Sequence, residues 1–193
     1  GELMRAAAAR GWRPEGVELD PALADRAEAG GFAVHRLPVE SAVLGQEAYA
    51  AVTAFEVFSQ MERPAAAAAE VYRLVKPGGV IYIREFNAGF HLALRRMEDM
   101  GLFRRFGARP SVLHPFNFRA RTLRLMLERA GFRDIVIRNS RPTAGDPYRS
   151  GGRLGGLLTA SLKVLYYYTA QAVWLASFGR ILIGSSLIVT ARK

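Results

Sequence analysis

Two carboxylates lie close together in the stretch GVELDP, at the end of an apolar run that predicts a buried strand. Asp20 directly precedes Pro21 and begins an alanine-rich segment, which is the pattern of a helix N-cap. Glu18 is not needed as a cap. Ligands of a parallel sheet bind beyond the carboxyl ends of its strands, so Glu18 is positioned to accept hydrogen bonds from the paired hydroxyls of a ribose. The alternative for Glu18 is a solvated acid or a salt bridge.

The elements around these acids alternate between short strands and helices. Apolar runs of strand length are followed by alanine-rich or amphipathic segments that end at glycine, which is typical of parallel βαβ units. This pattern predicts one α/β domain over residues 1–193 with a mostly parallel sheet. We expect strands at 15–19, 33–37, 51–57, 80–86, 132–140 and 184–193, and helices at 2–11, 20–30, 63–75 and 121–131.

Composition excludes several classes of site. The 193 residues include no cysteine and only three histidines, which are far apart, so we expect no disulfide, no thiol nucleophile and no metal site. The net charge of +10 suits nucleic acid, anionic lipid or an acidic substrate, or it reflects an arginine-rich source genome. We expect no nucleic-acid partner, because the arginines are interleaved with core-type Leu, Met and Phe and no recognition motif accompanies them.

Several short motifs follow one another in a specific order. They read GELMRAAAARGW, PEGVELDP, LPVESA, AVTAFEV, RLVKPGGVIYIREFN, LERAGF and GSSLIVTARK. In this order the chain resembles the class I S-adenosylmethionine-dependent methyltransferases, within the small-molecule group that carries an LKPGG turn. The resemblance implies a Rossmann-like doubly wound, mostly parallel sheet with an antiparallel last strand. A nicotinamide dehydrogenase would share the first half of such a fold but not the KPGG turn or the last strand.

The beginning of the chain is interpreted through the same resemblance. A ribose-binding acid follows a glycine loop by about 20 residues, and Glu18 stands 17 positions after Gly1. We therefore expect Gly1 to be the last glycine of that loop, with the first strand and the other glycines missing. The missing strand would lie between EGVEL and AVTAFEV. Residues 1–193 alone are then expected to be marginally stable and to bind the cofactor weakly, and native upstream sequence to restore both properties.

The resemblance implies S-adenosylmethionine as cofactor and assigns its contacts by position. Glu18 would hold the ribose. Val39 and Glu40 would lie beside the adenine, and Phe55 and Glu56 would form the floor of the pocket next to the sulfonium. The ordinary alternatives are core packing for Val39 and Phe55 and a solvated loop acid for Glu40.

No catalytic residue is assigned from the sequence. Weak candidates for a general base on the acceptor side are Glu85, His91 and His114, and Asn87 is a further polar candidate there. The family pattern commonly has EH where this chain has SQ at 59–60. Methyl transfer does not require a base, because much of its rate comes from holding the acceptor behind the methyl group.

Two segments, 90–120 and 141–180, are expected to form insertions on the acceptor side or a lid. The apolar stretch 154–178 is too short between Lys163 and Arg180 to span a membrane. We expect it to pack over the sheet or to line the acceptor site through Trp174 and Tyr166–Tyr168. An amphipathic helix on a lipid surface is an alternative that we do not favour. It would be helped by Arg95, Arg96, Arg104 and Arg105.

The predicted function is methyl transfer to a small-molecule acceptor by a cytoplasmic enzyme. The alternatives are a binding or scaffold module that kept the fold without turnover, and a methyltransferase for a lipid-like acceptor at a membrane surface. Neither the acceptor nor the oligomeric state follows from the sequence.

Overall fold

The strands form two sheets that no strand pairing joins within the residues that the computed structural model describes, which are 1–104, 111–142 and 153–193, the last without the side chains of 153–160. The predicted insertions at 90–120 and 141–180 include 105–110 and 143–152, which lie outside the described residues. In chain order the elements are α1 (Glu2–Ala8), β1 (Glu15–Val17), α2 (Pro21–Glu28), β2 (Ala33–His35), β3 (Tyr49–Phe55), the 3-10 helix η1 (Phe58–Gln60), α3 (Pro64–Leu74), β4 (Val75–Phe86), α4 (Ala88–Asp99), α5 (Ala120–Ala130), β5 (Arg133–Asn139), α6 (Arg153–Ala176) and β6 (Ser186–Arg192).

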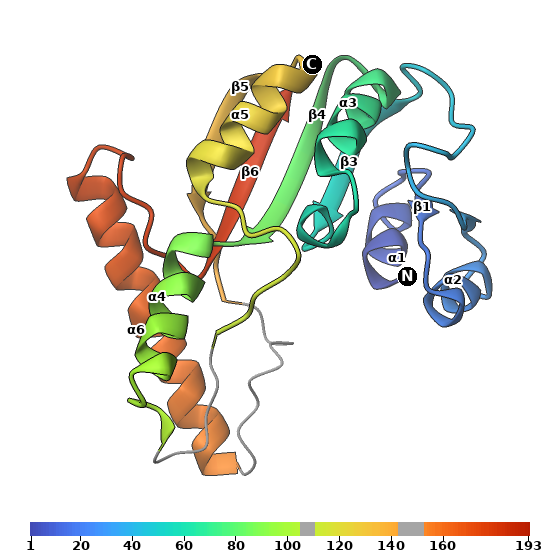
Figure 1. Ribbon diagram of the computed structural model, residues 1–193. Coiled ribbons are helices and arrows are strands. Elements are labelled where there is room, and N and C mark those ends of the chain that lie inside the picture. Colours follow the sequence, from blue (N-terminus) through green and yellow to red (C-terminus); the bar gives the residue numbers. More distant parts are fainter. Residues whose placement is uncertain (105–110, 143–152) are drawn as a thin grey trace.

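The sheet pattern confirms the predicted fold class. The small sheet pairs β1 with β2 in parallel. The larger sheet has the order β3-β4-β6-β5, in which β3 and β4 are parallel. β6 runs antiparallel to both β4 and β5, as predicted for the last strand. Figure 1 shows the small sheet with α1 and α2 beside β3, and α4 and α6 at the other side of the larger sheet.

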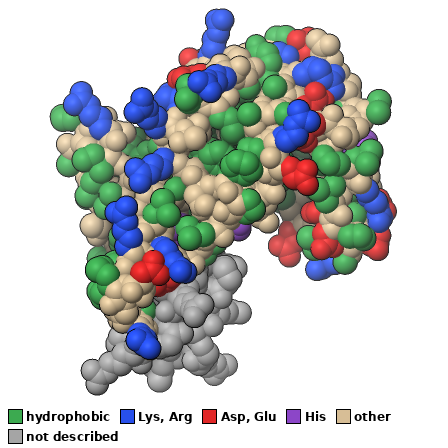
Figure 2. All heavy atoms as spheres, viewed as in Figure 1, with side chains coloured by type: hydrophobic (Ala, Val, Ile, Leu, Met, Phe, Trp, Pro, Cys, Tyr) green, Lys and Arg blue, Asp and Glu red, His purple; other side chains and the backbone are tan. Residues whose placement is uncertain are grey.

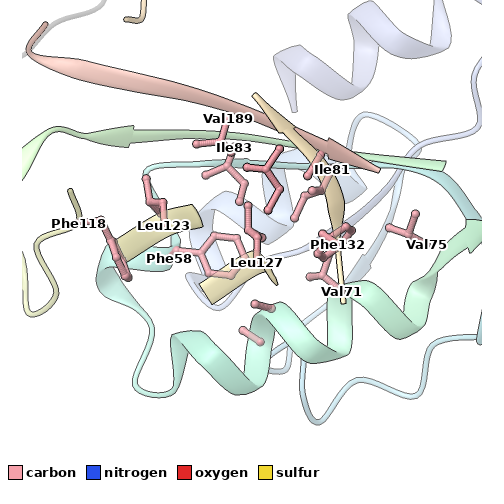
Figure 3. Close-up of a cluster of buried hydrophobic side chains, with 14 of the residues drawn as sticks. Phe58, Val71, Val75, Ile81, Ile83, Phe118, Leu123, Leu127, Phe132 and Val189 are labelled. Atoms are coloured by element: carbon pink, nitrogen blue, oxygen red, sulfur yellow. The ribbon is translucent and has the colours of Figure 1, made fainter. Parts of the chain in front are cut away.

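Helices α3 and α5 cover one face of the larger sheet (Figure 1). Alternate residues of β4 and β6 point into this layer, and Ile81, Ile83 and Val189 are fully buried there. Figure 3 shows them meeting Phe58 of η1 and Leu123 and Leu127 of α5. The opposite face of β4, with Tyr82, Arg84 and Phe86, is only half-buried. Burial of one face therefore accounts for most of the hydrophobic stabilisation of this sheet.

The KPGG segment, residues 76–79, is part of strand β4. It was expected to separate α3 from a strand at 80–86, but β4 begins at Val75, directly after α3. Val75 pairs with Tyr49, and a register shift between Tyr49 and Ala51 accommodates the segment in between. Gly78 has a φ of 76°, in the left-handed region. A Cβ on Gly79 would lie 2.9 Å from the carbonyl oxygen of Ala50, so this position requires glycine for close approach of the two strands.

We predict that Gly79→Ala destabilises the protein, because the added methyl group would meet backbone atoms that cannot move aside. The free energy of unfolding should fall by about 1 to 3 kcal/mol, the usual effect of overpacking. Gly45→Ala is the matched control, since a Cβ there meets only the Ala48 side chain at 3.4 Å. Urea unfolding of both variants checks this, and equal midpoints would contradict the inferred clash.

The strands of the small sheet are shorter than predicted. β1 and β2 each contain three residues, whereas runs of five apolar-patterned residues were expected at 15–19 and 33–37. Leu19 and Leu37, the last residues of those runs, are exposed. Among the described residues β1 has β2 as its only partner, so nothing extends the ladder of hydrogen bonds to these leucines.

Other boundaries follow local backbone conformation. β3 ends at Phe55, two residues earlier than predicted, because Glu56 adopts a left-handed φ of 57°. α5 ends at Gly131, whose φ of 109° makes it a left-handed C-cap, as its sequence predicted. None of the helices in the described parts of the chain is long and apolar enough to cross a bilayer, which agrees with the sequence prediction for 154–178.

Candidate active site

The two acids of GVELDP have separate roles. Asp20 has the capping role that its position predicted, and Glu18 makes a local hydrogen bond. Asp20 Oδ1 accepts hydrogen bonds from the backbone N–H of Ala22 at 2.8 Å and of Leu23 at 3.1 Å, which confirms it as the N-cap of α2. Glu18 Oε1 accepts the backbone N–H of Asp20 at 2.9 Å. This bond orients a half-buried carboxylate at the carboxyl end of β1 and uses one of its oxygens.

A polar cluster connects the amino ends of β1 and β3. The Tyr49 hydroxyl donates to Glu15 Oε2 at 2.7 Å, and His35 of β2 lies 3.2 Å from the same oxygen. Hydrogen bonds from Tyr49 and His35 lower the pKa of Glu15. Burial, with the neighbouring Glu15, raises the pKa of Tyr49 to about 12. Because β1 and β3 begin side by side, Glu18 and Phe55 both stand at the far, carboxyl ends of their strands.

Phe55 and Glu56 differ in how accessible they are. The Phe55 ring packs at a tilt against Tyr82, with centroids 5.7 Å apart, and remains partly exposed. The Glu56 carboxylate forms an ion pair with Arg84 of β4, and Arg84 Nε also donates to Ser140 Oγ at 3.1 Å. The structure therefore holds Glu56 through β4, whereas the Phe55 ring is accessible to a ligand.

The three remaining cofactor candidates are placed differently from one another. Val39 is 8% exposed and belongs to the main hydrophobic core, so its side chain packs there and the core alternative applies. Glu40 follows it as a half-buried residue. Gly1 is the N-cap of α1, and a Cβ there would lie 3.6 Å from Ala27 Cα. This is ordinary contact, so local space does not require glycine at position 1.

Glu85 is a buried carboxyl group, not an accessible base. It is 0% exposed and points into the layer between the sheet and η1, where the backbone N–H of Ser59 donates to Oε1 at 3.2 Å. Oε2 has no hydrogen-bond partner within the described residues. Burial raises the pKa of Glu85, against hydrogen bonds from the Phe58–Ser59 segment that lower it. The candidacy of Glu85 as a base is corrected on this ground, because no acceptor molecule reaches it.

We predict that the protein loses stability as the pH rises above the ordinary range for a glutamate, and that Glu85→Gln removes much of this dependence. The folded-state pKa lies above the unfolded value, so the unfolded chain ionises first as the pH increases and becomes favoured. Unfolding in urea at about pH 5 and about pH 8 measures the effect. Glu62→Gln, at an exposed position, is the control. If the free energy of unfolding changed equally with pH in wild type and in Glu85→Gln, the pH dependence would not come from Glu85.

Asn87 and His91 hold the structure together at the carboxyl end of β4. Asn87 Oδ1 caps α4 by accepting the N–H of Gly89 at 3.0 Å, and its Nδ2 donates to the carbonyl of Gly184 at 2.8 Å. His91 is 2% exposed, Nδ1 accepts the N–H of Val112 at 3.1 Å, and Nε2 lies 3.1 Å from the carbonyl of Ser185. Both ring nitrogens are engaged, so His91 is a structural residue here and the proposal of a base is corrected.

His114 differs from His91 in the hydrogen bonding of its ring. Its ring stacks on Phe86 with centroids 5.5 Å apart, and its Nε2 is buried without a hydrogen-bond partner among the residues described. The loop around it is fixed, because Asn117 Nδ2 donates to the His114 carbonyl at 2.7 Å and the Phe116 N–H donates to the Ser59 carbonyl at 3.0 Å. His114 therefore presents an unused nitrogen beside the carboxyl end of β4.

Arg84 and Phe86 are important residues that the sequence analysis did not single out. They occupy alternate positions of β4 on the half-buried face, where Arg84 holds Glu56 and Phe86 carries the His114 ring. The period-two alternation of VIYIREF was the signal that places them together. Tyr49, which connects the two sheets, had no comparable signal.

A hollow between α5 and β5 lies near the amino end of β4, away from this site. It is lined by Arg124, Glu128, Phe132, Arg133, Asp134, Ile135 and Val136. In the sheet Arg133 is opposite Arg192, which is opposite Val80 near the beginning of β4. Phe86 is opposite Ser186 at the other end of the same ladder. The hollow is therefore distant from the carboxyl ends where the site residues gather.

The sequence matches the family of methyltransferase domains over residues 1–136, well over half of the chain. The chain belongs to this family. No curated protein sequence matches it, but many solved structures share its fold. An S-adenosylmethionine-dependent methyltransferase from Archaeoglobus fulgidus superimposes with a TM-score of 0.64 and 18% identity, over 100% of this chain and 81% of its own. One from Mesorhizobium loti gives a TM-score of 0.63 and 18% identity, over 99% and 85%.

A third structural neighbour contains the cofactor. Phosphoethanolamine N-methyltransferase 2 of Haemonchus contortus, in complex with S-adenosyl-L-methionine, has a TM-score of 0.58 and 13% identity, over 100% of this chain and 46% of its own. The family and these neighbours establish an S-adenosylmethionine-dependent methyltransferase. The Rossmann-like fold and the cofactor expected from the sequence are thereby confirmed.

The residues at the carboxyl ends of the strands fit this cofactor. Glu18 offers an oriented, half-buried carboxylate, which is the acceptor that ribose hydroxyls require. Phe55 at the carboxyl end of β3 and Val57 just after it expose apolar side chains. A carboxylate for the sugar and an apolar surface for the thioether portion suit the two chemically distinct parts of the molecule.

Proposed function

We propose that this methyltransferase acts on a small organic acceptor that binds at the carboxyl end of β4, beside Phe86 and His114. The observation that carries the proposal is the buried Nε2 of His114, which has no partner in the described parts of the chain. An unpaired buried ring nitrogen is unfavourable unless a ligand or water supplies its hydrogen bond. Exposed Leu113 and Phe116 on the same loop favour an acceptor with apolar surface.

The chain's own residues would orient the acceptor and remove its proton. When bound, S-adenosylmethionine supplies a methyl group on a positively charged sulfur, and the acceptor's lone pair displaces the sulfur in line. Glu18 would hold the ribose and fix the cofactor relative to β3. Phe86 would support the flat ring of His114. His114 Nε2 is closed to solvent before the acceptor binds, so the half-buried ring would have to shift to take the proton of an acceptor hydroxyl or amine, and it would release that proton to solvent when the product leaves. The partly exposed Phe55 would exclude water beside the methyl group.

The test is transfer of labelled methyl from S-adenosylmethionine to the components of a metabolite extract. We expect label in at least one small molecule, identified by mass spectrometry. Cofactor binding measured by calorimetry, without label in any acceptor, would instead favour a binding module of the same fold. Label that partitions only into the lipid fraction would replace the small-molecule acceptor by a lipid-like one.

A further inference from the structure

The outer side of α6 carries a stripe of exposed apolar side chains. Leu162, Leu165, Tyr168 and Leu175 recur at spacings of three and seven residues, which places them on one face of a helix. Leu175, for example, is 66% exposed. This contradicts the expectation that the apolar segment 154–178 is used up in packing over the sheet. Among the side chains of α6 that the structure describes, those on the inner side make such contacts.

The inner side of α6 is fixed to the protein, so the stripe cannot turn inward. The Tyr166 hydroxyl donates to the carbonyl of Ile183, and Asn139 Nδ2 of β5 donates to the carbonyl of Ala170 at 3.0 Å. Trp174 lies under the guanidinium of Arg138, 5.9 Å from its ring centroid. These contacts lie at successive turns and fix the orientation of α6 about its axis, so the apolar stripe faces outward.

The turn after α6 extends this surface. Phe178 is 91% exposed although it is large and apolar. It has a left-handed φ of 52°, a conformation unfavourable for a residue with a Cβ. The Gly179 N–H donates to the Trp174 carbonyl at 2.7 Å and fixes the turn. Arg180 and the half-exposed Ile181 follow directly. The turn therefore presents an aromatic and an aliphatic side chain on either side of a cation.

The charge of this region is positive. Residues 147–193 contain no Asp or Glu, whereas Lys163 and Arg180 belong to α6 and its turn. Helix α4 contacts α6 through Phe90 and Tyr166. It carries Arg95 and Arg96 but also Glu98 and Asp99, so the positive excess comes from α6 and its turn. Figure 2 shows Lys and Arg side chains interspersed with hydrophobic ones over the side of the molecule formed by α4 and α6. A second copy of this chain, with net charge +10, would be repelled here, whereas an anionic surface would be attracted.

We propose that the outer face of α6, with the turn Phe178–Ile181, binds the surface of an anionic phospholipid bilayer. The exposed apolar side chains would enter the boundary between head groups and acyl chains, while Arg180 and neighbouring cations contact the phosphates. The helix lies flat on the bilayer in this arrangement. The inference does not depend on which acceptor the enzyme methylates.

The test is co-sedimentation of the full chain with vesicles made of equal parts phosphatidylcholine and phosphatidylserine. We expect binding at physiological salt that is strongly reduced with pure phosphatidylcholine or at about 1 M salt, where screening is nearly complete. The double variant Leu175→Glu with Phe178→Glu should reduce the bound fraction at least about tenfold, because it places charge at the boundary region. Leu125→Glu on α5, an exposed leucine outside this surface, is the control and should bind as wild type does.

Thermal melting shows whether each variant remains folded. The melting temperature should be unchanged, because the substituted side chains are exposed. Two outcomes would overturn the proposal. One is the absence of wild-type binding to vesicles of either composition. The other is concentration-dependent self-association, seen by light scattering and lost in the double variant, without vesicle binding, which would make this face an interface between copies.

Discussion

His114→Asn is expected to lower turnover by about 100- to 10,000-fold, the usual contribution of a general base. The substitution removes Nε2, the buried nitrogen that lacks a partner within the described residues, and keeps a side chain that fits beside Phe86. The affinity for S-adenosylmethionine should stay unchanged, because Glu18 and the end of β3 are separate from this ring. Single-turnover transfer of labelled methyl to the identified acceptor measures the effect.

The pH profile separates a base from a packing residue. If His114 accepts the proton, the transfer rate of wild type depends on pH in a way that the rate of the variant does not. His35→Asn is the control for loss of an imidazole, because the His35 ring interacts with Glu15 and not with Phe86, although the residue itself ends β2 beside Glu18. An unchanged rate in His114→Asn would show that methyl transfer here proceeds by positioning alone, without a base at this position.

Glu18→Ala is expected to weaken S-adenosylmethionine binding by about 1.5 to 3 kcal/mol, or roughly 10- to 150-fold, the range for hydrogen bonds to a charged group. The carboxylate is half-buried at the end of β1 and already oriented by the Asp20 N–H. Isothermal calorimetry gives the dissociation constant directly. Glu18→Gln retains an oxygen for the Asp20 N–H, so weaker binding by this variant as well would attribute the effect to the ligand and not to the turn.

Asp20→Ala provides the contrast two residues away. Asp20 accepts two N–H groups of the first turn of α2, so its loss should reduce the free energy of unfolding by about 1 kcal/mol. Cofactor affinity per folded molecule should change little. Equal affinity of wild type and Glu18→Ala would remove the ribose assignment, whatever the stability of the two proteins.

His91 and His114 show how contacts in the folded protein separate two residues of the same type. His91 and His114 were equivalent candidates by residue type, and both rings contact Phe86. Val112 and Ser185, far from His91 in sequence, occupy both nitrogens of its ring. No contact of this kind reaches His114 Nε2 from the described residues. Residue type proposed both histidines, and three-dimensional contacts distinguished them.

Local signals in the sequence determined the α/β alternation, the N-cap at Asp20 and the C-cap at Gly131. Each depends on conformational preferences of a few neighbouring residues, which exist before the chain folds. The antiparallel last strand and the family also followed from motifs in the sequence and are confirmed by the sheet and the comparisons.

Only the tertiary structure decided the roles that depend on distant partners. It buried Glu85 beneath η1, paired Glu56 with Arg84, and linked the two sheets through Tyr49 and Glu15. It also showed which side of α6 faces solvent, because Asn139 and Ile183 fix the rotation of that helix. Burial and hydrogen bonding depend on atoms brought together by folding, so residue type and spacing could propose these sites but could not choose among them.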